Sequence, residues 1–323
     1  MRHLLLGALV LASLGSFGCG GDFSNEDLEF LNALPERKVL AAALPDAPQN
    51  AAALDGSVSA LALGETSKLY ADTRRVSTEF NRGVDGLLAL LEGIRSVPPT
   101  TRAPGARTWG PYPDKQHPGM DVRFLMTRQL ARFTYSLQYR RTGEGEDAWW
   151  SLIEGEFNAS AGIRKGEGSV SLLISEARAR GYAQGDLSGL DTLSIGYQTL
   201  TQPVRVEEIF DFAAGTTGPS EVRYTYRAFT DGPGEMHFVI RDTQATPGTA
   251  LETLDITSRW TASQGGAGSV LVLSGDYAGA RSVECWNGAG QTVFERANWD
   301  PFGGSGELRA CPDLSAFGAL PGT

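Results

Sequence analysis

Histidine is scarce in this chain, and that scarcity excludes most histidine-dependent catalysis. The 323 residues include three histidines, and His3 belongs to the leader described below, so that His117 and His237 remain. A nucleophilic triad would need one of them as its base, and no Gly-x-Ser-x-Gly turn accompanies either. The helical zinc motif His-Glu-x-x-His is also missing. We therefore expect no catalytic residue, no metal ion and no cofactor.

Long apolar runs and clustered cations are missing as well. The apolar run from Leu4 to Leu14 holds about eleven residues, whereas a membrane-spanning helix needs roughly 20. The formal net charge is −10 at pH 7, which argues against nucleic acid as a partner because phosphate binding requires clustered Lys and Arg. The same acidity argues against electrostatic attraction to anionic lipid.

The N-terminus has the pattern of a bacterial signal peptide over residues 1–18. A weakly positive start precedes the apolar run, and small residues follow it. Cys19 then stands where a lipobox places the cysteine that is acylated as the first mature residue, and Gly18 fits that motif. Ser16 and Phe17 replace its usual leucine and small residue. We expect export and palmitate-type lipidation of Cys19, with an ordinary signal peptide cut nearby as the alternative.

The expected lipid chains define the compartment. Several acyl chains hold a protein stably on a membrane, whereas one chain holds it only marginally. We therefore expect a cell-envelope protein anchored at the outer membrane or periplasmic face. The membrane is then a partner only through the N-terminal lipid.

Cysteine pairing agrees with export. Of three cysteines, lipidation of Cys19 would leave Cys285 and Cys311 as an even pair. In an oxidising compartment such a pair predicts a disulfide. Closing a loop of about 26 residues would stabilise the fold by about 3.5 kcal/mol in the chain-entropy treatment. A metal site is the competing interpretation, and it needs more ligands than two distant thiols.

Residues 19–65 are predicted to be a lipidated tether, and residues 66–323 a helix followed by a single β domain. Ser24 is placed to cap a short helix within the tether. The stretch from Ala41 to Ala62 is rich in alanine and holds two prolines, which is typical of a spacer. A flexible spacer after an acylated cysteine would keep the folded body clear of the membrane.

The clearest helical pattern covers residues 66–96. Its apolar residues are three, four or seven positions apart and so share one stripe: Leu69, Val76, Phe80, Val84, Leu87, Leu91 and Ile94. Thr66 and Ser67 can cap its start, and Pro98-Pro99 ends it. At 1.5 Å per residue the helix would be roughly 45 Å long. Because its polar face mixes both charge signs, packing on a core is favoured over lying on a membrane.

After Trp109-Gly110-Pro111 the apolar period changes from 3.6 to 2. Phe133, Tyr135, Leu137 and Tyr139 alternate with polar residues, as in a strand with one buried face. Similar runs predict about eleven or twelve strands between residues 120 and 298, with no second helical segment between them. Without crossover helices the sheet should be an antiparallel meander.

Such a sheet must curl to bury its apolar face. We therefore expect a mostly β fold: a barrel, half-barrel or curled sheet with the long helix packed on it. An integral outer-membrane barrel is the alternative, although it would not normally carry a lipobox.

A glycine-rich repeat follows three aromatic strands. Its copies are Gly166-Glu167-Gly168-Ser169-Val170, Gly266-Ala267-Gly268-Ser269-Val270 and, more loosely, Gly232-Pro233-Gly234-Glu235-Met236. We interpret each as a hairpin turn or bulge that needs positive φ. A phosphate-binding glycine loop would open a helix, and these copies precede strands instead.

Acidic and aromatic residues offer the remaining candidates for a site. Glu154 and Glu156 share one strand face at about 7 Å, within the range used by inverting glycosidases, but they lie opposite the face with Trp149, Ile153 and Phe157, in water. Further candidates are Glu207, Glu208 and Asp211 as acids near in sequence, Asp300 to Glu307 as a calcium loop, and Trp149-Trp150, Trp260, Trp286 and Trp299 as a pocket lining. We expect surface acids, a solvated turn and interior aromatics.

Four short motifs, structural in character, are spread over most of the mature chain. They are Leu34-Pro35-Glu36, Gly64-Glu65 to Tyr70, Pro98-Pro99-Thr100 ahead of Trp109-Gly110-Pro111, and Glu284-Cys285-Trp286. Together they resemble a group of uncharacterised myxobacterial lipoproteins. The resemblance implies a bacterial lipoprotein precursor and no particular chemistry, because the group carries no assigned activity.

Two classes of function remain. The first is a binding module in which a β cavity holds a lipid or other hydrophobic ligand, and a broad apolar sheet under one helix favours it. The alternative is a structural or protein-interaction lipoprotein with a filled core and no ligand, whose protein partner is unknown. An enzyme is not expected.

Overall fold

The computed structural model describes residues 23–43, 63–162, 164–182, 189–215, 218–244 and 250–320. The predicted signal peptide and Cys19 lie outside these residues, as does most of the alanine-rich spacer.

The described strands follow one another in chain order and form one open antiparallel meander, as predicted. They are β1 (Thr101–Ala103), β2 (Ala106–Pro113), β3 (Met120–Gln129), β4 (Arg132–Arg141), β5 (Trp150–Asn158), β6 (Glu167–Leu173), β7 (Leu190–Gln198), β8 (Val204–Phe212), β9 (Glu221–Ala228), β10 (Gly234–Thr243), β11 (Glu252–Trp260), β12 (Gly266–Ser274), β13 (Arg281–Trp286), β14 (Thr292–Ala297) and β15 (Ser305–Gly306). Twelve of these, β3 to β14, lie in the region where eleven or twelve were predicted.

The described helices include α2 and α4, which the sequence did not predict. They are α1 (Asn25–Asn32), α2 (Arg37–Leu40), α3 (Lys68–Arg95), α4 (Ile174–Ala179) and the short 3-10 turns η1 (Glu146–Ala148), η3 (Leu308–Ala310) and η4 (Ser315–Phe317). The long helix α3 confirms the stripe over residues 66–96. The expectation of no helical segment among the strands is wrong, because α4 separates β6 from β7. Six residues are too few to display a 3.6-residue repeat.

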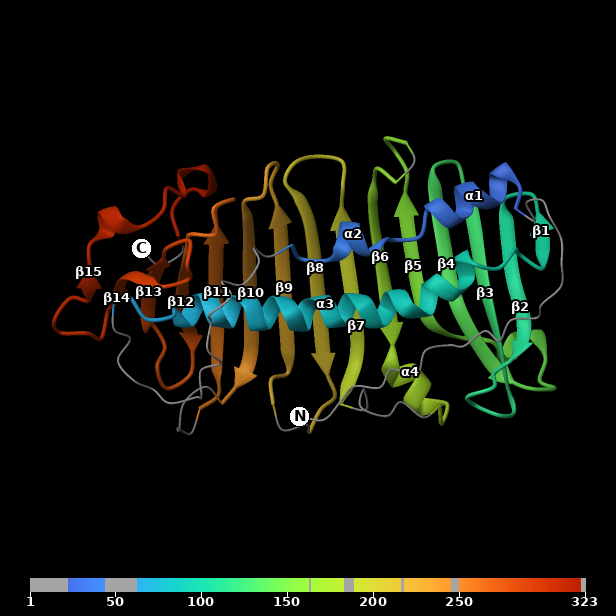
Figure 1. The fold of residues 1–323 in the computed structure, drawn as a ribbon. Coiled ribbons are helices and arrows are strands. Elements are labelled where there is room, and N and C mark those ends of the chain that lie inside the picture. The colour runs from blue at the N-terminus through green and yellow to red at the C-terminus, as the bar shows by residue number, and fades with distance from the viewer. Residues whose placement is uncertain are drawn as a thin grey trace. The chain divides into compact units, whose positions relative to one another are not determined.

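The chain divides into two compact units. Unit 1 comprises the described residues within 1–41, 82–201 and 208–213, and unit 2 those within 42–81, 202–207 and 214–323. Within unit 1, strands β2 to β7 lie side by side and alternate in direction (Figure 1). Within unit 2, β9 to β14 do the same (Figure 1).

One face of each unit's strands is buried beneath α3, and we call it the inner face. The opposite face of the same strands is called the outer face. On β4 the predicted alternation holds, since Phe133, Tyr135, Leu137 and Tyr139 are buried and their neighbours are partly exposed. The residues of α3 that lie in unit 1 contribute Val84, Leu87, Leu88, Leu91 and Ile94, all buried. Each such side chain stabilises the fold by roughly 1.5–3 kcal/mol through loss of exposed apolar surface.

The glycine repeats serve two purposes, of which the sequence predicted one. The predicted positive φ is found in one copy, at Gly232 with φ of 103°, whereas the glycines of the other two copies have ordinary φ at the starts of β6 and β12. Gly168 and Gly234, by contrast, lie inside strands directly opposite the aromatic residues Tyr197 and Trp260. A Cβ at either glycine would overlap the ring across from it. Glycine is required at these positions because the ring lies over the neighbouring backbone.

A bulge in β5 changes which face of the sheet Trp149 occupies. A register shift lies where Leu137 and Gln138 of β4 pair with Ile153 and Ser151, so that Leu152 is the extra residue of a bulge. The bulge turns Trp150 onto the buried face, while Trp149 stacks under the guanidinium groups of Arg123 and Arg140 at 4.2 and 4.4 Å. The prediction that Trp149 shares the face of Ile153 is therefore wrong, because a bulge reverses the alternation.

Residues 23–43 pack on the folded body rather than forming part of the predicted tether. Ser24 caps α1 as expected, and its side chain and that of Asp27 form reciprocal hydrogen bonds with backbone N–H groups. Asp27 is buried and accepts hydrogen bonds from Arg107 of β2 at 2.5 Å and Arg102 of β1 at 3.0 Å. Burial opposes ionisation, but these bonds and the N–H of Ser24 hold the pKa of Asp27 well below its usual range.

Candidate functional site

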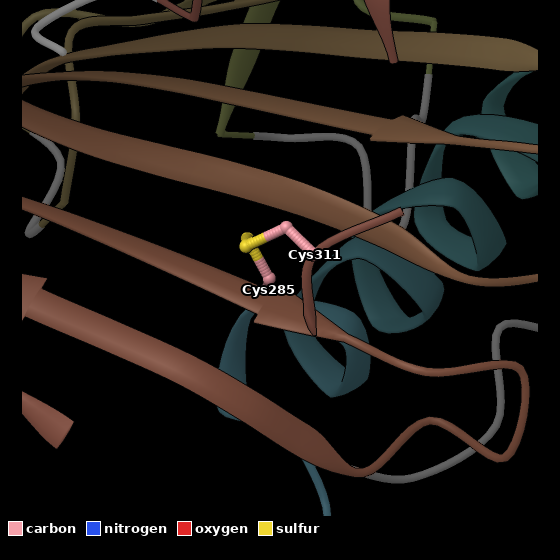
Figure 2. The surroundings of a disulfide bond; sticks show 2 residues. All are labelled: Cys285 and Cys311. Carbon is pink, nitrogen blue, oxygen red and sulfur yellow. A yellow bond between two sulfur atoms is a disulfide. The ribbon is translucent and has the colours of Figure 1, made fainter. Parts of the chain in front are cut away.

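The predicted disulfide is present. Cys285 of β13 and Cys311, which follows η3, are bonded with a Cα–Cα distance of 5.4 Å (Figure 2). Cys285 is buried on the face opposite α3, because its neighbour Glu284 contacts the helix. The pairing was available from the sequence, since cysteine count and the expected compartment left one partner for each thiol.

The C-terminal segment continues from the disulfide across the outer face of unit 2. Arg259 of β11 donates hydrogen bonds to the carbonyl oxygens of Gly318 and Ala319 at 2.8 and 2.9 Å. Phe317 packs edge-on against Phe229, with 4.7 Å between ring centroids. Residues 311–320 therefore cover part of this face, where they shield the Arg259 guanidinium from water.

A carboxylate beneath this segment holds two arginines. Glu235 of β10 pairs with Arg227 at 2.6 Å and with Arg259 at 2.7 Å. Burial works against its ionisation, but the hydrogen bonds and positive charges of both arginines lower its pKa. With both oxygens of Glu235 held by guanidinium groups, the cluster stabilises the outer face and offers no free base.

His117 takes part in a cluster at the loop between β2 and β3. Its Nδ1 lies 2.9 Å from Oδ2 of Asp114, and its ring stacks on Tyr182 with 3.9 Å between centroids. Burial, followed by the neighbouring Tyr139 and Asp114, raises the pKa of Tyr182 well above its usual range. Because Tyr182 follows α4, the cluster joins that helix to the loop. The described contacts of His117 include no serine, threonine or cysteine nucleophile.

His237 lies on the outer, polar face of β10, as predicted. Its Nε2 is 2.9 Å from Oδ1 of Asp255 on the neighbouring strand. The two residues sit diagonally across the β10–β11 pair, because His237 is directly opposite Thr257. The pair is a cross-strand polar contact of the kind that stabilises sheets.

The carboxylates that were compared with a glycosidase pair lie on the outer face. Glu154 is exposed, and Glu156 forms a 2.5 Å ion pair with Arg132 on the neighbouring strand. Of the three acids further along the chain, Glu207 and Asp211 make contacts of the same kind. Glu207 pairs with Arg223, while Asp211 accepts a hydrogen bond from Thr192 at 2.6 Å. These contacts are those of surface acids, as the sequence predicted.

Glu208 is the exception, and it contradicts the expectation that these acids lie on the surface. Its exposed fraction is 0 %, and neither carboxyl oxygen has a hydrogen-bond partner among the described residues. It lies against Gly83 of α3, where an added Cβ would overlap Oε1. Burial raises its pKa well above the usual value. Two features of the sequence could have indicated that Glu208 is buried. It stands between Val206 and Phe210 in an alternating strand, and the long helix carries a glycine, Gly83.

A second buried glutamate binds the start of α3. Oε2 of Glu284 accepts the backbone N–H of Leu69 at 3.0 Å, and Oε1 accepts the hydroxyl of Thr292 at 2.6 Å. Ser67 caps the same end, as predicted, by accepting the N–H of Tyr70. The role of Glu284 was not predicted, because 215 residues separate it from Leu69.

The remaining candidates behave as local structure. The carboxylate of Asp300 accepts the backbone N–H groups of Phe302 and Gly304, and Glu307 forms an exposed pair with Arg309. Within the described ranges no group of three or more His, Cys, Asp or Glu side chains could hold a metal ion. Trp150, Trp260 and Trp286 are buried, whereas Trp299 is exposed and does not line the interior.

Comparison with known proteins yields no match: no family model, curated protein or solved structure is similar to the chain. Among the described residues, no helix has both the length and the apolar character required to cross a membrane.

Proposed function

We propose that this chain is a lipid-anchored envelope protein that presents the polar outer face of its sheet to a protein partner. The anchor would be Cys19, as the lipobox indicates. The inner face would serve only to hold the body together.

The observation that carries this proposal is the direct contact of α3 with the strands beneath it. In unit 2, Thr73 Oγ1 lies 2.6 Å from Ser258 Oγ, and a Cβ on Gly268 would lie 3.1 Å from Leu69. In unit 1, Gly83 leaves no room for even a methyl group beside Glu208. At these positions the helix and sheet leave no space for a ligand.

The outer face of unit 1 has the chemistry of a recognition surface. Hydroxyl pairs cross its strands, with Thr127 and Thr134 at 2.7 Å and Ser171 and Ser194 at 2.9 Å. Arginine–carboxylate pairs such as Arg132–Glu156 lie on the same face. Such groups, half in water, can exchange their partners for those of another protein at little desolvation cost.

The hydrophobic-ligand carrier is the second candidate, and one observation favours it. Away from the contact of Gly83 with Glu208, unit 1 holds buried polar atoms that lack partners among the described residues: Arg95 Nε and Tyr197 Oη. A ligand with a polar headgroup would supply the missing hydrogen bonds, and buried polar groups are otherwise almost always paired.

Native mass spectrometry of the mature protein, extracted in polymer-bounded lipid discs without detergent, separates the two candidates. The proposal requires the mass of the acylated polypeptide alone. A discrete hydrophobic species that stays bound and leaves on denaturation would replace the proposal with the carrier.

Site-specific photo-cross-linking then tests the polar face in intact cells. A photoreactive residue at Ser171, on the outer face, is expected to give one discrete protein adduct. The same residue at Lys115, an exposed position in the loop between β2 and β3, is the matched control and should give none. Equal labelling from both positions would argue against a defined partner on this face.

A further inference from the structure

One turn of unit 1 displays a leucine in an unusual way. Leu130 joins β3 to β4, and its side chain is 93 % exposed. The flanking residues Gln129 and Arg132 pair across the hairpin, so the turn has two residues. Leu130 adopts φ of 56°, a region that two-residue hairpins usually fill with Gly, Asn or Asp. Neither the fold nor water favours leucine here, which points to a contact outside the chain.

Direct contacts tie this turn to α1. Arg128 donates from Nε to the carbonyl oxygen of Leu130 at 2.9 Å and ion-pairs through Nη1 with Glu29 of α1. Phe30 of α1 packs edge-on against Phe133 of β4, with 5.5 Å between centroids. Figure 1 shows α1 beside the ends of β3 and β4. A second apolar side chain, Leu28 on α1, is 46 % exposed.

The distance along the chain links this surface to the expected anchor. Cys19 precedes Ser24, the N-cap of α1, by five positions. An extended chain spans at most about 3.6 Å per residue, so the two Cα atoms lie within roughly 18 Å of each other. Asp27 holds this end of α1 to the sheet through Arg107. Acyl chains on Cys19 would therefore bring the α1 edge of unit 1 to the lipid surface.

Charge at this surface is balanced. Arg128 pairs with Glu29, and Arg132 on the other side of the turn pairs with Glu156. An apolar tip between neutralised charges suits the interface of a zwitterionic bilayer and does not require anionic lipid.

We infer that the β3–β4 turn, with α1 beside it, docks on the bilayer that holds the anchor and inserts Leu130 at the headgroup level. The inference rests on the proposed lipidation of Cys19. It adds to the anchor a fixed orientation, in which β3 rises away from the membrane from its Gln129 end.

The orientation is tested by measuring how strongly brominated lipid chains quench the fluorescence of engineered tryptophans. Leu130→Trp is compared with Lys115→Trp, which lies in the loop at the opposite end of β3. The ten residues of β3 separate these loops by about 33 Å at 3.3 Å per residue. Each full-length mature variant is reconstituted in phosphatidylcholine vesicles with brominated acyl chains, and the signal of the native tryptophans is subtracted using the wild type.

The inference requires that the tryptophan of the Leu130→Trp variant be quenched at least several-fold more than that of the Lys115→Trp variant, unchanged by added salt. Leu28→Trp serves as an independent probe on α1 and should show intermediate quenching. Mass spectrometry of the N-terminal peptide reports acylation separately. Equal quenching in an acylated protein would overturn the docking while the anchor stands, and an unmodified Cys19 would overturn both.

Discussion

Two buried glutamates contact α3 in opposite circumstances. In unit 2, both oxygens of Glu284 are used, one by the N–H of Leu69 and one by the hydroxyl of Thr292. In unit 1, both oxygens of Glu208 lack a partner among the described residues, and the helix meets them with Gly83. The first glutamate attaches the helix to the sheet, and the second is a cost that the surrounding packing offsets. Burial alone therefore does not reveal what a carboxyl group contributes.

The largest expected effect comes from removing the satisfied group. Glu284→Ala would leave a buried N–H and a buried hydroxyl unpaired at the positively polarised end of α3. We expect a loss of about 3 kcal/mol in the free energy of unfolding, measured by urea denaturation. Glu284→Gln, which keeps one acceptor oxygen, is the control and should lose less. If both variants lost the same free energy of unfolding, the hydrogen bonds of Glu284 would not contribute to stability.

Placing a methyl group against the unpaired carboxyl group of Glu208 should lower the free energy of unfolding somewhat less than Glu284→Ala does. Gly83→Ala adds a Cβ that overlaps Oε1 of Glu208, and overpacking of this kind costs about 1–3 kcal/mol. The double variant Gly83→Ala with Glu208→Ala removes the overlapping atoms, so it should recover most of the loss. Additive effects in this cycle would show that the two residues are not in contact.

Neutralising Glu208 should be stabilising, and increasingly so as pH rises. Its pKa is raised by burial in the folded state, so between the unfolded and folded pKa values the native chain binds more protons than the unfolded chain. The free energy of unfolding of the wild type should then fall as pH rises above about 4.5, by up to about 1.4 kcal/mol per pH unit.

Glu208→Gln cannot ionise and provides the reference for that slope. We expect it to match the wild type near pH 4 and to exceed it by about 1 kcal/mol or more at pH 7, in denaturation curves at several pH values. A difference that is constant across pH would contradict a buried, protonated carboxyl group at this position.

The smallest effect is expected at an outer-face acid. Glu156→Gln removes an exposed ion pair with Arg132, and such pairs contribute about 0–1 kcal/mol. Denaturation midpoints should therefore be nearly unchanged, and the small difference should shrink in 1 M salt. A large loss would mean that outer-face pairs stabilise the sheet, which would weaken their assignment to recognition.

Local patterns determined much of this protein in advance. Period-2 alternation identified the antiparallel meander, a 3.6-residue stripe identified α3, and cysteine count identified the Cys285–Cys311 pair. These features depend on residues close in sequence or on simple counting, so the sequence alone carries them. The lipidation of Cys19 also follows from a local motif, and it remains a prediction because that residue lies outside the described ranges.

Tertiary structure alone decided the rest, because the decisive contacts join residues far apart in the chain. Asp27 and Arg107, 80 positions apart, place α1 on the body instead of in a tether. One bulge residue, Leu152, reverses Trp149 and Trp150, and a glycine on α3 admits a buried Glu208. Alternation assigns a residue to a face, but which face meets another element, and whether a polar group finds a partner there, depends on how distant segments pack together.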